Sequence, residues 1–356
     1  MLSSMDRSAP HVPVSRRRLG KLPARSCQLG VVIALAMSIA ACSSGEEDAQ
    51  MAATTPTAGM GASAPCTAKP GMLRGHSAQT LMAGGLSRSF HYYAPQSLDP
   101  NQPAPVVFVA HGYLMNGDLM RQISGFEALA EQHGFVVIFP DGQGDRAAAP
   151  TMDPPWNVGQ DVCQPIGAPA PLAMGDDQAF IDAMLDFARA DQCVDENHVF
   201  MTGFSMGGYF SNHNGCVRSD LRAVAPHSAG SYDLSACPAT PKPIMLVHFE
   251  QDGLIPYTCG TEARDRWLAR NGCDAAAPPE TRMVTGGLCE YYQGCPAGAQ
   301  VAMCTLQAPE ATSDEFALGH GWAGGATTSP AISMLSIPEA ASASELVWGF
   351  FTEFAW

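Results

Sequence analysis

The chain contains little lysine, with only Lys21, Lys69 and Lys242 among its 356 residues. Lysine and arginine together number 19 against 34 aspartate and glutamate residues, so the formal net charge at pH 7 is −15. An excess of negative charge repels phosphate backbones, because nucleic-acid binding depends on basic side chains. The composition therefore argues against nucleic acid as a partner.

An apolar run long enough to cross a bilayer, about 20 residues, is also lacking. Residues 29–41 form a shorter run behind the basic segment of residues 15–21. A short apolar run with a basic flank is typical of an export signal. Small residues before Cys42 resemble a bacterial lipobox, which implies lipidation of Cys42; an ordinary cleaved signal peptide is the alternative. The paired arginines leave both the Sec and the twin-arginine export routes open.

These features predict three regions. Residues 1–41 are an export signal, residues 42–70 a flexible tether of small and polar residues, and residues 71–356 a single catalytic domain. Without the signal the net charge becomes −20. We expect an extracellular, outer-membrane or cell-surface bacterial lipoprotein that meets the membrane only through its anchor at Cys42.

No CxxC pair occurs, which argues against structural zinc, and we expect no metal and no cofactor. Ten cysteines remain besides Cys27 and Cys42, at positions 66, 163, 193, 216, 237, 259, 273, 289, 295 and 304. An even number of cysteines in an exported chain predicts disulfides. Their pairing does not follow from the sequence, but Cys193 and Cys216 are both expected toward the lower end of the sheet.

Strand-like and helix-like segments alternate and no repeat is visible, which predicts an α/β fold: a mostly parallel central sheet with helices on both faces. Strands are expected at residues 89–94, 105–110, 135–139, 199–202, 223–226, 243–249 and 301–306, and helices at 118–132, 176–190, 207–216, 262–270 and 343–354. Residues 141–175 and 274–298 are expected to be irregular and to form pocket walls.

The segment Gly203-Phe204-Ser205-Met206-Gly207 fits the pattern G-x-S-x-G between an expected strand and an expected helix. A nucleophilic serine needs such a sharp strand-to-helix turn, and the two glycines leave room where strand and helix meet. Ser205 is therefore the predicted nucleophile, and a chance glycine-serine turn is the alternative.

Serine needs a general base, and in this kind of arrangement an acid and then a histidine follow the serine along the chain. His320 lies between two glycines just before the last helix and is the predicted base, with a solvent-facing loop histidine as the alternative. His213 on the nucleophile's helix and His248 inside an apolar strand are expected to be structural.

The acid is expected at the carboxyl end of a buried strand, where sites gather in open α/β sheets. Asp252 follows the strand at residues 243–249 at that position and is the predicted acid. Glu250 and, less favoured, Asp233 are its rivals.

Two backbone N–H groups should stabilise the oxyanion. We expect one at Met206, directly after the nucleophile, and the other at Tyr113, after the strand that leads into His111-Gly112. A simple turn at His111-Gly112 is the alternative.

Several motifs together resemble the secreted feruloyl esterase, acetylxylan esterase and polyhydroxybutyrate depolymerase family of α/β hydrolases. They are His111-Gly112, Trp156-Asn157-Val158-Gly159, Asp176 to Ile181, Cys193 to Val199, Gly203 to Gly208, His248 to Tyr257 and Gly319-His320-Gly321-Trp322.

The resemblance implies an α/β-hydrolase fold with Ser205, Asp252 and His320 as the catalytic residues. It also implies that Trp156 and Trp322 lie near the substrate, with packing as the alternative and the favoured one for Trp156. Tyr113 departs from the small residue usual in this family, and Phe249-Glu250-Gln251-Asp252 departs from its usual acid loop.

The expected function is that of a serine carboxylic ester hydrolase acting on feruloyl or acetyl esters of plant polysaccharide, or on similar small esters. A polyhydroxyalkanoate depolymerase or oligomer hydrolase is the first alternative. A surface lipoprotein that binds without catalysis is the second, and a peptidase on the same fold is less favoured.

Overall fold

The computed structural model describes residues 66–143, 156–158, 163, 175–308 and 319–354. These residues all lie in the compact unit Met60–Trp356. The predicted export signal, Cys42 and most of the predicted tether and of the segment 141–175 lie outside the described residues. None of the helices found in the described ranges combines the length and apolarity needed to cross a membrane.

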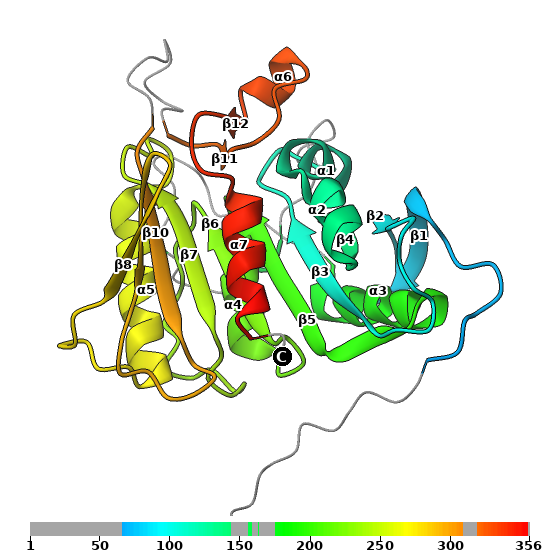
Figure 1. Cartoon of the computed structure of the whole chain (residues 1–356), viewed down its shortest axis with the longest axis horizontal. Coiled ribbons are helices and arrows are strands. Elements are labelled where there is room, and N and C mark those ends of the chain that lie inside the picture. Colours follow the sequence, from blue (N-terminus) through cyan, green and yellow to red (C-terminus); the bar gives the residue numbers. More distant parts are fainter. Residues whose placement is uncertain (1–65, 144–155, 159–162, 164–174, 309–318, 355–356) are drawn as a thin grey trace, which may run out of the picture. The chain divides into compact units, whose positions relative to one another are not determined.

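Ten strands of the described part form one sheet, in the order β1-β2-β4-β3-β5-β6-β7-β10-β9-β8 (Figure 1). They are β1 (Gly75–Ala83), β2 (Leu86–Ala94), β3 (Ala104–Ala110), β4 (Val136–Pro140), β5 (Val194–Phe204), β6 (Ala223–His227), β7 (Ile244–Phe249), β8 (Glu280–Val284), β9 (Gly287–Tyr291) and β10 (Val301–Leu306). The strands from β4 through β10 in this order are parallel to one another, whereas β1, β2, β9 and β8 join at the two sides in antiparallel fashion.

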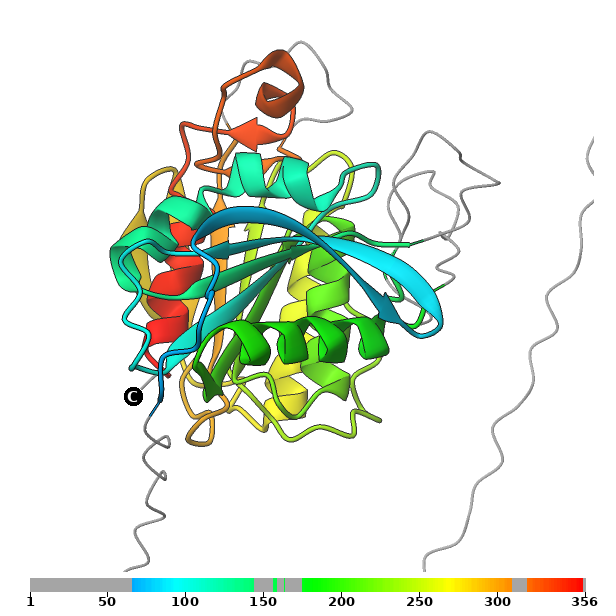
Figure 2. The same ribbon diagram turned by 90° about the vertical axis from the view of Figure 1, so that its right-hand side faces the viewer.

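Helices cover both faces of the sheet, since its central strands are apolar on both sides. Along β3, Val107 and Val109 join one core, and Val106 and Phe108 join the other. The first core packs against α1 (Gly117–Ser124), α2 (Phe126–His133) and α7 (Ala343–Thr352); the second packs against α3 (Asp177–Asp191), α4 (Met206–Val217) and α5 (Tyr257–Asn271). Figure 2 shows α2 and α7 on the opposite side of the sheet from α4 and α5.

The predicted fold class is confirmed, and three of its details were wrong. The helix expected at residues 118–132 is split into α1 and α2 by Gly125, whose φ of 73° is left-handed and ends the first helix. The segment 274–298 contains the β8–β9 hairpin rather than only irregular chain. Strand β1 was not predicted. Both β1 and β8 lie at the sides of the sheet and expose side chains along their length, so neither shows a buried strand's apolar run.

All ten cysteines after Cys42 pair, which confirms the predicted disulfides. The pairs are Cys66–Cys193, Cys163–Cys259, Cys216–Cys237, Cys273–Cys295 and Cys289–Cys304. Cys193 and Cys216, both expected toward the lower end of the sheet, are not bonded to each other, since Cys193 pairs with Cys66 and Cys216 with Cys237.

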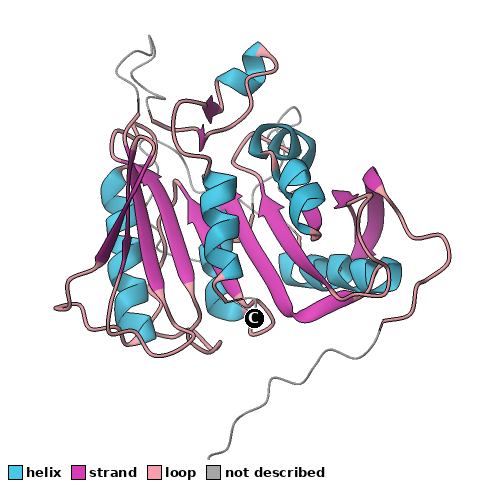
Figure 3. Cartoon of the chain, viewed as in Figure 1, coloured by secondary structure: helices cyan, strands magenta, loops and turns pink. Residues whose placement is uncertain are grey.

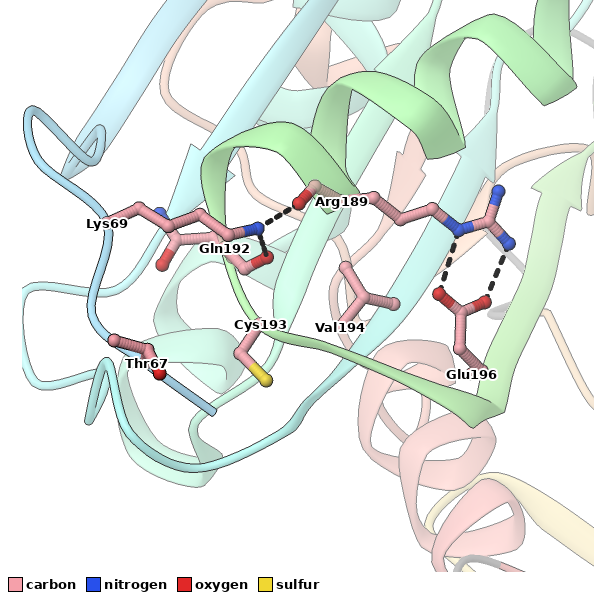
Figure 4. Close-up of a pocket in the computed structure, with 7 residues that line it drawn as sticks. All are labelled: Thr67, Lys69, Arg189, Gln192, Cys193, Val194 and Glu196. Atoms are coloured by element: carbon pink, nitrogen blue, oxygen red, sulfur yellow. Dashed lines mark hydrogen bonds and ion pairs between the residues drawn. The ribbon is translucent and has the colours of Figure 1, made fainter. Parts of the chain in front are cut away.

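Both lysines beyond the predicted signal cap the carboxyl end of a helix. The ammonium group of Lys69 donates to the carbonyls of Arg189 and Gln192 at the end of α3 (Figure 4). That of Lys242 donates to the carbonyls of Arg218, which caps α4, and of Leu221. Cations at these positions satisfy carbonyls that a helix leaves free and oppose the negative end of its dipole.

The hollow drawn in Figure 4 lies at the amino end of β5, about 30 Å along that strand from its carboxyl end. Its charged groups already have partners: Arg189 forms a two-pronged pair with Glu196 at 2.8 and 2.6 Å, and Lys69 donates to backbone carbonyls of α3 and its cap. Together with the Cys66–Cys193 disulfide, these contacts attach the N-terminal segment to α3. We assign this hollow to the structural attachment of that segment.

Candidate active site

Ser205 lies in the turn between β5 and α4. Figure 3 shows the central parallel strands ending at one edge of the sheet. Its φ of 54° and ψ of −117° are strained for a residue with a side chain. The turn is held by the Ser205 N–H, which donates to the carbonyl of His227 at 2.9 Å, and by two N–H groups of α4 that donate to the Ser205 carbonyl. The side chain is 8% exposed.

The two glycines of the motif are required because no side chain fits at either position. A Cβ on Gly203 would lie 2.3 Å from the carbonyl oxygen of Gly207, and one on Gly207 would lie 2.1 Å from that of Ala110. Both contacts are with backbone, which cannot rotate away, so the strand and helix approach more closely than any other residue would permit.

This close approach gives a stability prediction. Gly207→Ala is expected to lower the free energy of unfolding by about 3 kcal/mol or more, through overpacking against the backbone. The control is Gly349→Ala in α7, where an added Cβ meets nothing within 4 Å. It should raise the free energy of unfolding by up to about 1 kcal/mol. Urea unfolding of both variants checks this, and equal effects would contradict the steric argument.

The structure brings the three predicted catalytic residues together. His320 Nε2 lies 3.0 Å from Ser205 Oγ, and His320 Nδ1 lies 3.0 and 2.9 Å from the two carboxylate oxygens of Asp252. Asp252 Oδ1 also accepts the backbone N–H groups of Leu254 and Ile255 at 3.0 and 2.8 Å. Because its carboxylate is held by its own loop, Asp252 fixes the orientation of the imidazole.

The loops that carry the acid and the base are packed against each other. Gly319 has a left-handed φ of 74°, and a Cβ there would lie 2.9 Å from the backbone nitrogen of Asp252. This contact accounts for a glycine directly before His320. It also explains how residues 68 positions apart hold a fixed distance.

Glu250, Asp233 and His213 make other contacts, whereas His248 Nε2 lies 3.6 Å from Asp252 Oδ2. Glu250 is exposed and accepts a hydrogen bond from Gln307, and Asp233 is exposed and accepts the N–H of Ser235 within its own turn. His213 contacts the Tyr232 hydroxyl at 3.0 Å. His248 is buried in β7, and its Nε2 lies 3.0 Å from the carbonyl of Ile255. The structural role expected for both histidines stays a prediction.

The loop after β3 lies directly against the nucleophile. A Cβ on Gly112 would lie 3.2 Å from Ser205 Cβ, so the loop comes close to the nucleophile at Gly112. Tyr113 is the next residue along the chain. Met206 is the first residue of α4, and its N–H belongs to those that a helix leaves without an acceptor within it. The Tyr113 side chain is 44% exposed. The role of both N–H groups at an oxyanion stays a prediction.

Trp156 and Trp322 are buried, which agrees with the packing alternative, the favoured one for Trp156. They are 1% and 0% exposed, so their indole rings present almost no surface to a substrate. Trp156 Nε1–H donates to the carbonyl of His111 at 2.9 Å, and Trp322 Nε1–H to Ser344 Oγ at 3.2 Å. Both tryptophans pack beneath the site, because their large apolar area and single donor are satisfied inside the protein.

A buried ion pair supports the loop of His111 from below. Arg88 Nη2 lies 2.9 Å from Asp177 Oδ1, and Asp177 Oδ2 accepts the backbone and side-chain N–H groups of Asn157 at 2.8 and 3.1 Å. Burial raises the pKa of Asp177, and the bonds from Asn157 and Arg88 oppose that shift. Asn157 follows Trp156, which bonds to His111. The sequence motifs contained Trp156, Asn157 and Asp177, but only the fold shows this connection.

Three histidines of the described part, His213, His227 and His248, are held neutral. Burial lowers the pKa of His213 and His248, and lowers that of His227 well below its usual value of 6.5, with the charges of His248 and His320 adding to the effect at His227. Neutral, buried imidazoles stabilise the folded state only while they stay unprotonated.

This gives a pH prediction. Below pH 6.5 these histidines become protonated in the unfolded chain but stay neutral in the folded protein. The folded state therefore loses stability relative to the unfolded state as the pH falls. The free energy of unfolding should decrease from pH 7 to pH 5 by up to about 1.4 kcal/mol per pH unit for each histidine. Urea unfolding at several pH values measures the slope, and His213→Asn should reduce it. A flat profile would contradict the prediction.

Three potential metal ligands meet away from this site. The potential ligand atoms of His76, His91 and Asp118 lie within 4.8 Å of one another. Among the described residues, these three form the group that could hold a metal ion. The carboxylate of Asp118 is already bonded to Arg121 at 2.7 and 3.0 Å. The neighbouring positive charge disfavours a cation there.

Comparison with known proteins gives several related esterases. A feruloyl esterase B from Piromyces equi is 28% identical over 236 residues, 60% of this chain and 40% of the relative. A probable feruloyl esterase C from Aspergillus niger is 27% identical over 251 residues, 64% of this chain and 83% of the relative. A bifunctional acetylxylan esterase/xylanase from Neocallimastix patriciarum is 26% identical over 174 residues, 49% of this chain and 22% of the relative.

The chain thus spans less than half the length of the first and third of these relatives. Among solved structures, the acetyl xylan esterase from Aspergillus awamori overlaps 65% of this chain and 93% of its own, with a TM-score of 0.49 and 19% identity. No protein-family model matches the chain. The sequence relatives confirm the resemblance that the motifs predicted. This chain is a homologue of feruloyl esterases and of an acetylxylan esterase, and it has the mostly parallel sheet with helices on both faces that the resemblance to α/β hydrolases implied.

Proposed function

We propose that the protein is a serine carboxylic ester hydrolase that cleaves feruloyl or acetyl esters of plant polysaccharide, or similar small esters, through an acyl-enzyme on Ser205. The observation that carries the proposal is the position of His320 between Ser205 Oγ, at 3.0 Å, and the Asp252 carboxylate, at 2.9 Å. A histidine bonded to both groups can accept the serine proton and be stabilised while it holds it.

In the acylation step, Nδ1 of His320 carries a proton and donates it in a hydrogen bond to Asp252, which leaves Nε2 free to accept. Ser205 Oγ attacks the ester carbonyl while its proton passes to Nε2. The carbonyl oxygen becomes negative, and the N–H groups of Met206 and Tyr113 stabilise it. His320 then gives the proton to the departing alkoxide, and the alcohol leaves with the acyl group bound to Ser205.

In the deacylation step, a water molecule replaces the alcohol. His320 removes one of its protons as the water oxygen attacks the acyl carbon, and the same N–H groups stabilise the second oxyanion. The bond from the acyl carbon to Ser205 Oγ breaks, the proton returns to Oγ, and the carboxylic acid leaves. Every proton transfer in this cycle is carried out by the chain's own groups.

The substrate class is supported by the sequence relatives, which are feruloyl esterases and an acetylxylan esterase. Feruloyl and acetyl esters differ in the size of the acyl group but use the same reaction. Polyhydroxyalkanoate hydrolysis, the alternative from the sequence, would use the same three residues with a different acyl pocket.

A panel of esters tests this proposal. Purified protein is assayed on methyl ferulate, acetylated xylan, p-nitrophenyl butyrate and a 3-hydroxybutyrate oligomer. We expect the highest kcat/KM on a feruloyl or acetyl ester. Preference for the oligomer would select the alternative, and no hydrolysis of any ester would contradict the proposal as a whole.

We also propose that the protein acts outside the cytoplasm as one catalytic domain, residues 71–356, behind a tether and a lipid anchor at Cys42. Five disulfides among the described residues support an oxidising compartment. The anchor and the bacterial lipobox rest on the sequence alone. The intact mass of the mature protein, with Cys42→Ser as control, tests the lipidation.

A further inference from the structure

His227 is the last residue of β6 and lies beside the end of β5, where it pairs in register with Phe204. Its backbone carbonyl accepts the N–H of Ser205 at 2.9 Å. A Cβ on Gly208 would come within 2.6 Å of this carbonyl oxygen, so the first turn of α4 is packed against it as well. The main chain of His227 therefore fixes the position of the nucleophile.

The side chain of the same residue reaches the loop of the base. The backbone N–H of Ala323, three residues beyond His320, donates to His227 Nε2 at 3.3 Å. The imidazole also stacks on Trp322, with ring centroids 4.9 Å apart and an angle of 24° between the planes. Trp322 and Ala323 form β11 (Trp322–Ala323), which pairs with β12 (Ser336–Ile337).

The contacts define the protonation state of His227. Since Nε2 accepts a hydrogen bond, it carries no proton, and Nδ1–H is the donor to Ser228 Oγ at 3.1 Å. The ring is fully buried. Around it lie Phe204, Phe249 and Trp322, and its titratable neighbours are His248 and His320. Burial and these two neighbours lower the pKa of His227, so the ring remains a neutral acceptor.

We propose that His227 is a positioning residue that sets the distance between Ser205 and His320, by holding the nucleophile through its carbonyl and the base loop through its neutral Nε2. This inference rests on the proposed function. A displacement of one of two reacting groups by as little as 1 Å lowers a rate by about a hundredfold. A residue that touches both groups from opposite ends is therefore able to control the rate without contacting a substrate.

The test compares two amides of different reach. In His227→Gln the side-chain amide oxygen can occupy the place of Nε2 and accept from Ala323, whereas in His227→Asn it reaches only the place of Nδ1. We expect kcat of His227→Asn to fall about 10- to 100-fold with KM changed less than about twofold, the size of loss that a displacement of a reacting group by up to about 1 Å produces. His227→Gln should recover most of the lost kcat. The control is His213→Asn, which changes a half-buried histidine on α4 and should keep the wild-type kcat.

A spectroscopic measurement separates failure of this inference from failure of the proposed function. The Nδ1–H proton of His320, bonded to Asp252, gives a downfield proton resonance that needs no substrate. It should be retained in His227→Gln and broadened or shifted in His227→Asn. Equal kcat values and equal resonances for the two amides would overturn the role of Nε2. If no ester is hydrolysed by the wild type, the resonances alone still decide whether His227 positions the base.

Discussion

Ser205→Ala is expected to lower kcat for ester hydrolysis by about a million-fold, with KM nearly unchanged and the protein still folded. The loss is this large because the acyl-enzyme needs the Oγ that lies 3.0 Å from His320 Nε2. His320→Ala should cost about as much, since neither group is useful alone. Asp252→Asn should cost about ten-thousand-fold, because the amide favours the wrong imidazole tautomer.

The double variant gives the sharper result. If Ser205 and His320 act as one unit, Ser205→Ala combined with His320→Ala should be no slower than either alone. Glu250→Gln and His213→Ala are the matched controls, a carboxylate two residues from Asp252 and a histidine on the helix of Ser205, and both should stay near wild type. Initial rates on p-nitrophenyl butyrate measure all of these. Activity that survives in Ser205→Ala, or losses that multiply in the double variant, would refute the assignment.

Removal of the Cys66–Cys193 disulfide is expected to cost about 5 kcal/mol of unfolding free energy, against about 3 kcal/mol for Cys289–Cys304. The first bond joins residues 127 positions apart and the second joins residues 15 apart. A longer closed loop removes more conformational freedom from the unfolded chain. Losses of this size are comparable to the whole stability of a domain, so full reduction should unfold the protein.

Paired alanine substitutions test this ranking. Alanine is chosen over serine because Cys289 and Cys304 are buried, and a hydroxyl there would need a partner. Urea unfolding of Cys66→Ala/Cys193→Ala and of Cys289→Ala/Cys304→Ala gives the two losses. A larger loss for the short loop would show that packing, not loop length, determines the contribution. An unchanged melting temperature after full reduction would contradict a structural role for all five bonds.

The positions of Ser205, His320 and Asp252 could be anticipated because each depends on short-range sequence features. A strand, a glycine-flanked serine and a helix specify a turn, and the carboxyl end of a buried strand specifies a place for the acid. The choice of Asp252 over Glu250 is explained by contacts within the loop, because two backbone N–H groups of that loop donate to the Asp252 carboxylate. His320 then follows from the order of the three residues along the chain, in which the histidine comes after the acid.

Other features depend on contacts between distant segments, which a sequence read locally does not contain. The family resemblance implied that Trp322 lies near the substrate, but its ring packs against Phe126 and His227 inside the protein. The partner of Cys193 comes from the N-terminal segment, 127 positions away. His227 gave no signal as a site residue, since its role comes from two bonds to separate loops.

The helix caps formed by Lys69 and Lys242 have a practical consequence for handling the protein. No other lysine occurs after the predicted signal, and both amines are engaged with carbonyls. Burial also lowers the pKa of Lys242 to about 8, yet the group is 3% exposed and out of reach of reagents. Amine-directed coupling, biotinylation or crosslinking will therefore attach poorly to the folded domain. Carboxylates, which are abundant on this chain, are the better handle for immobilising it.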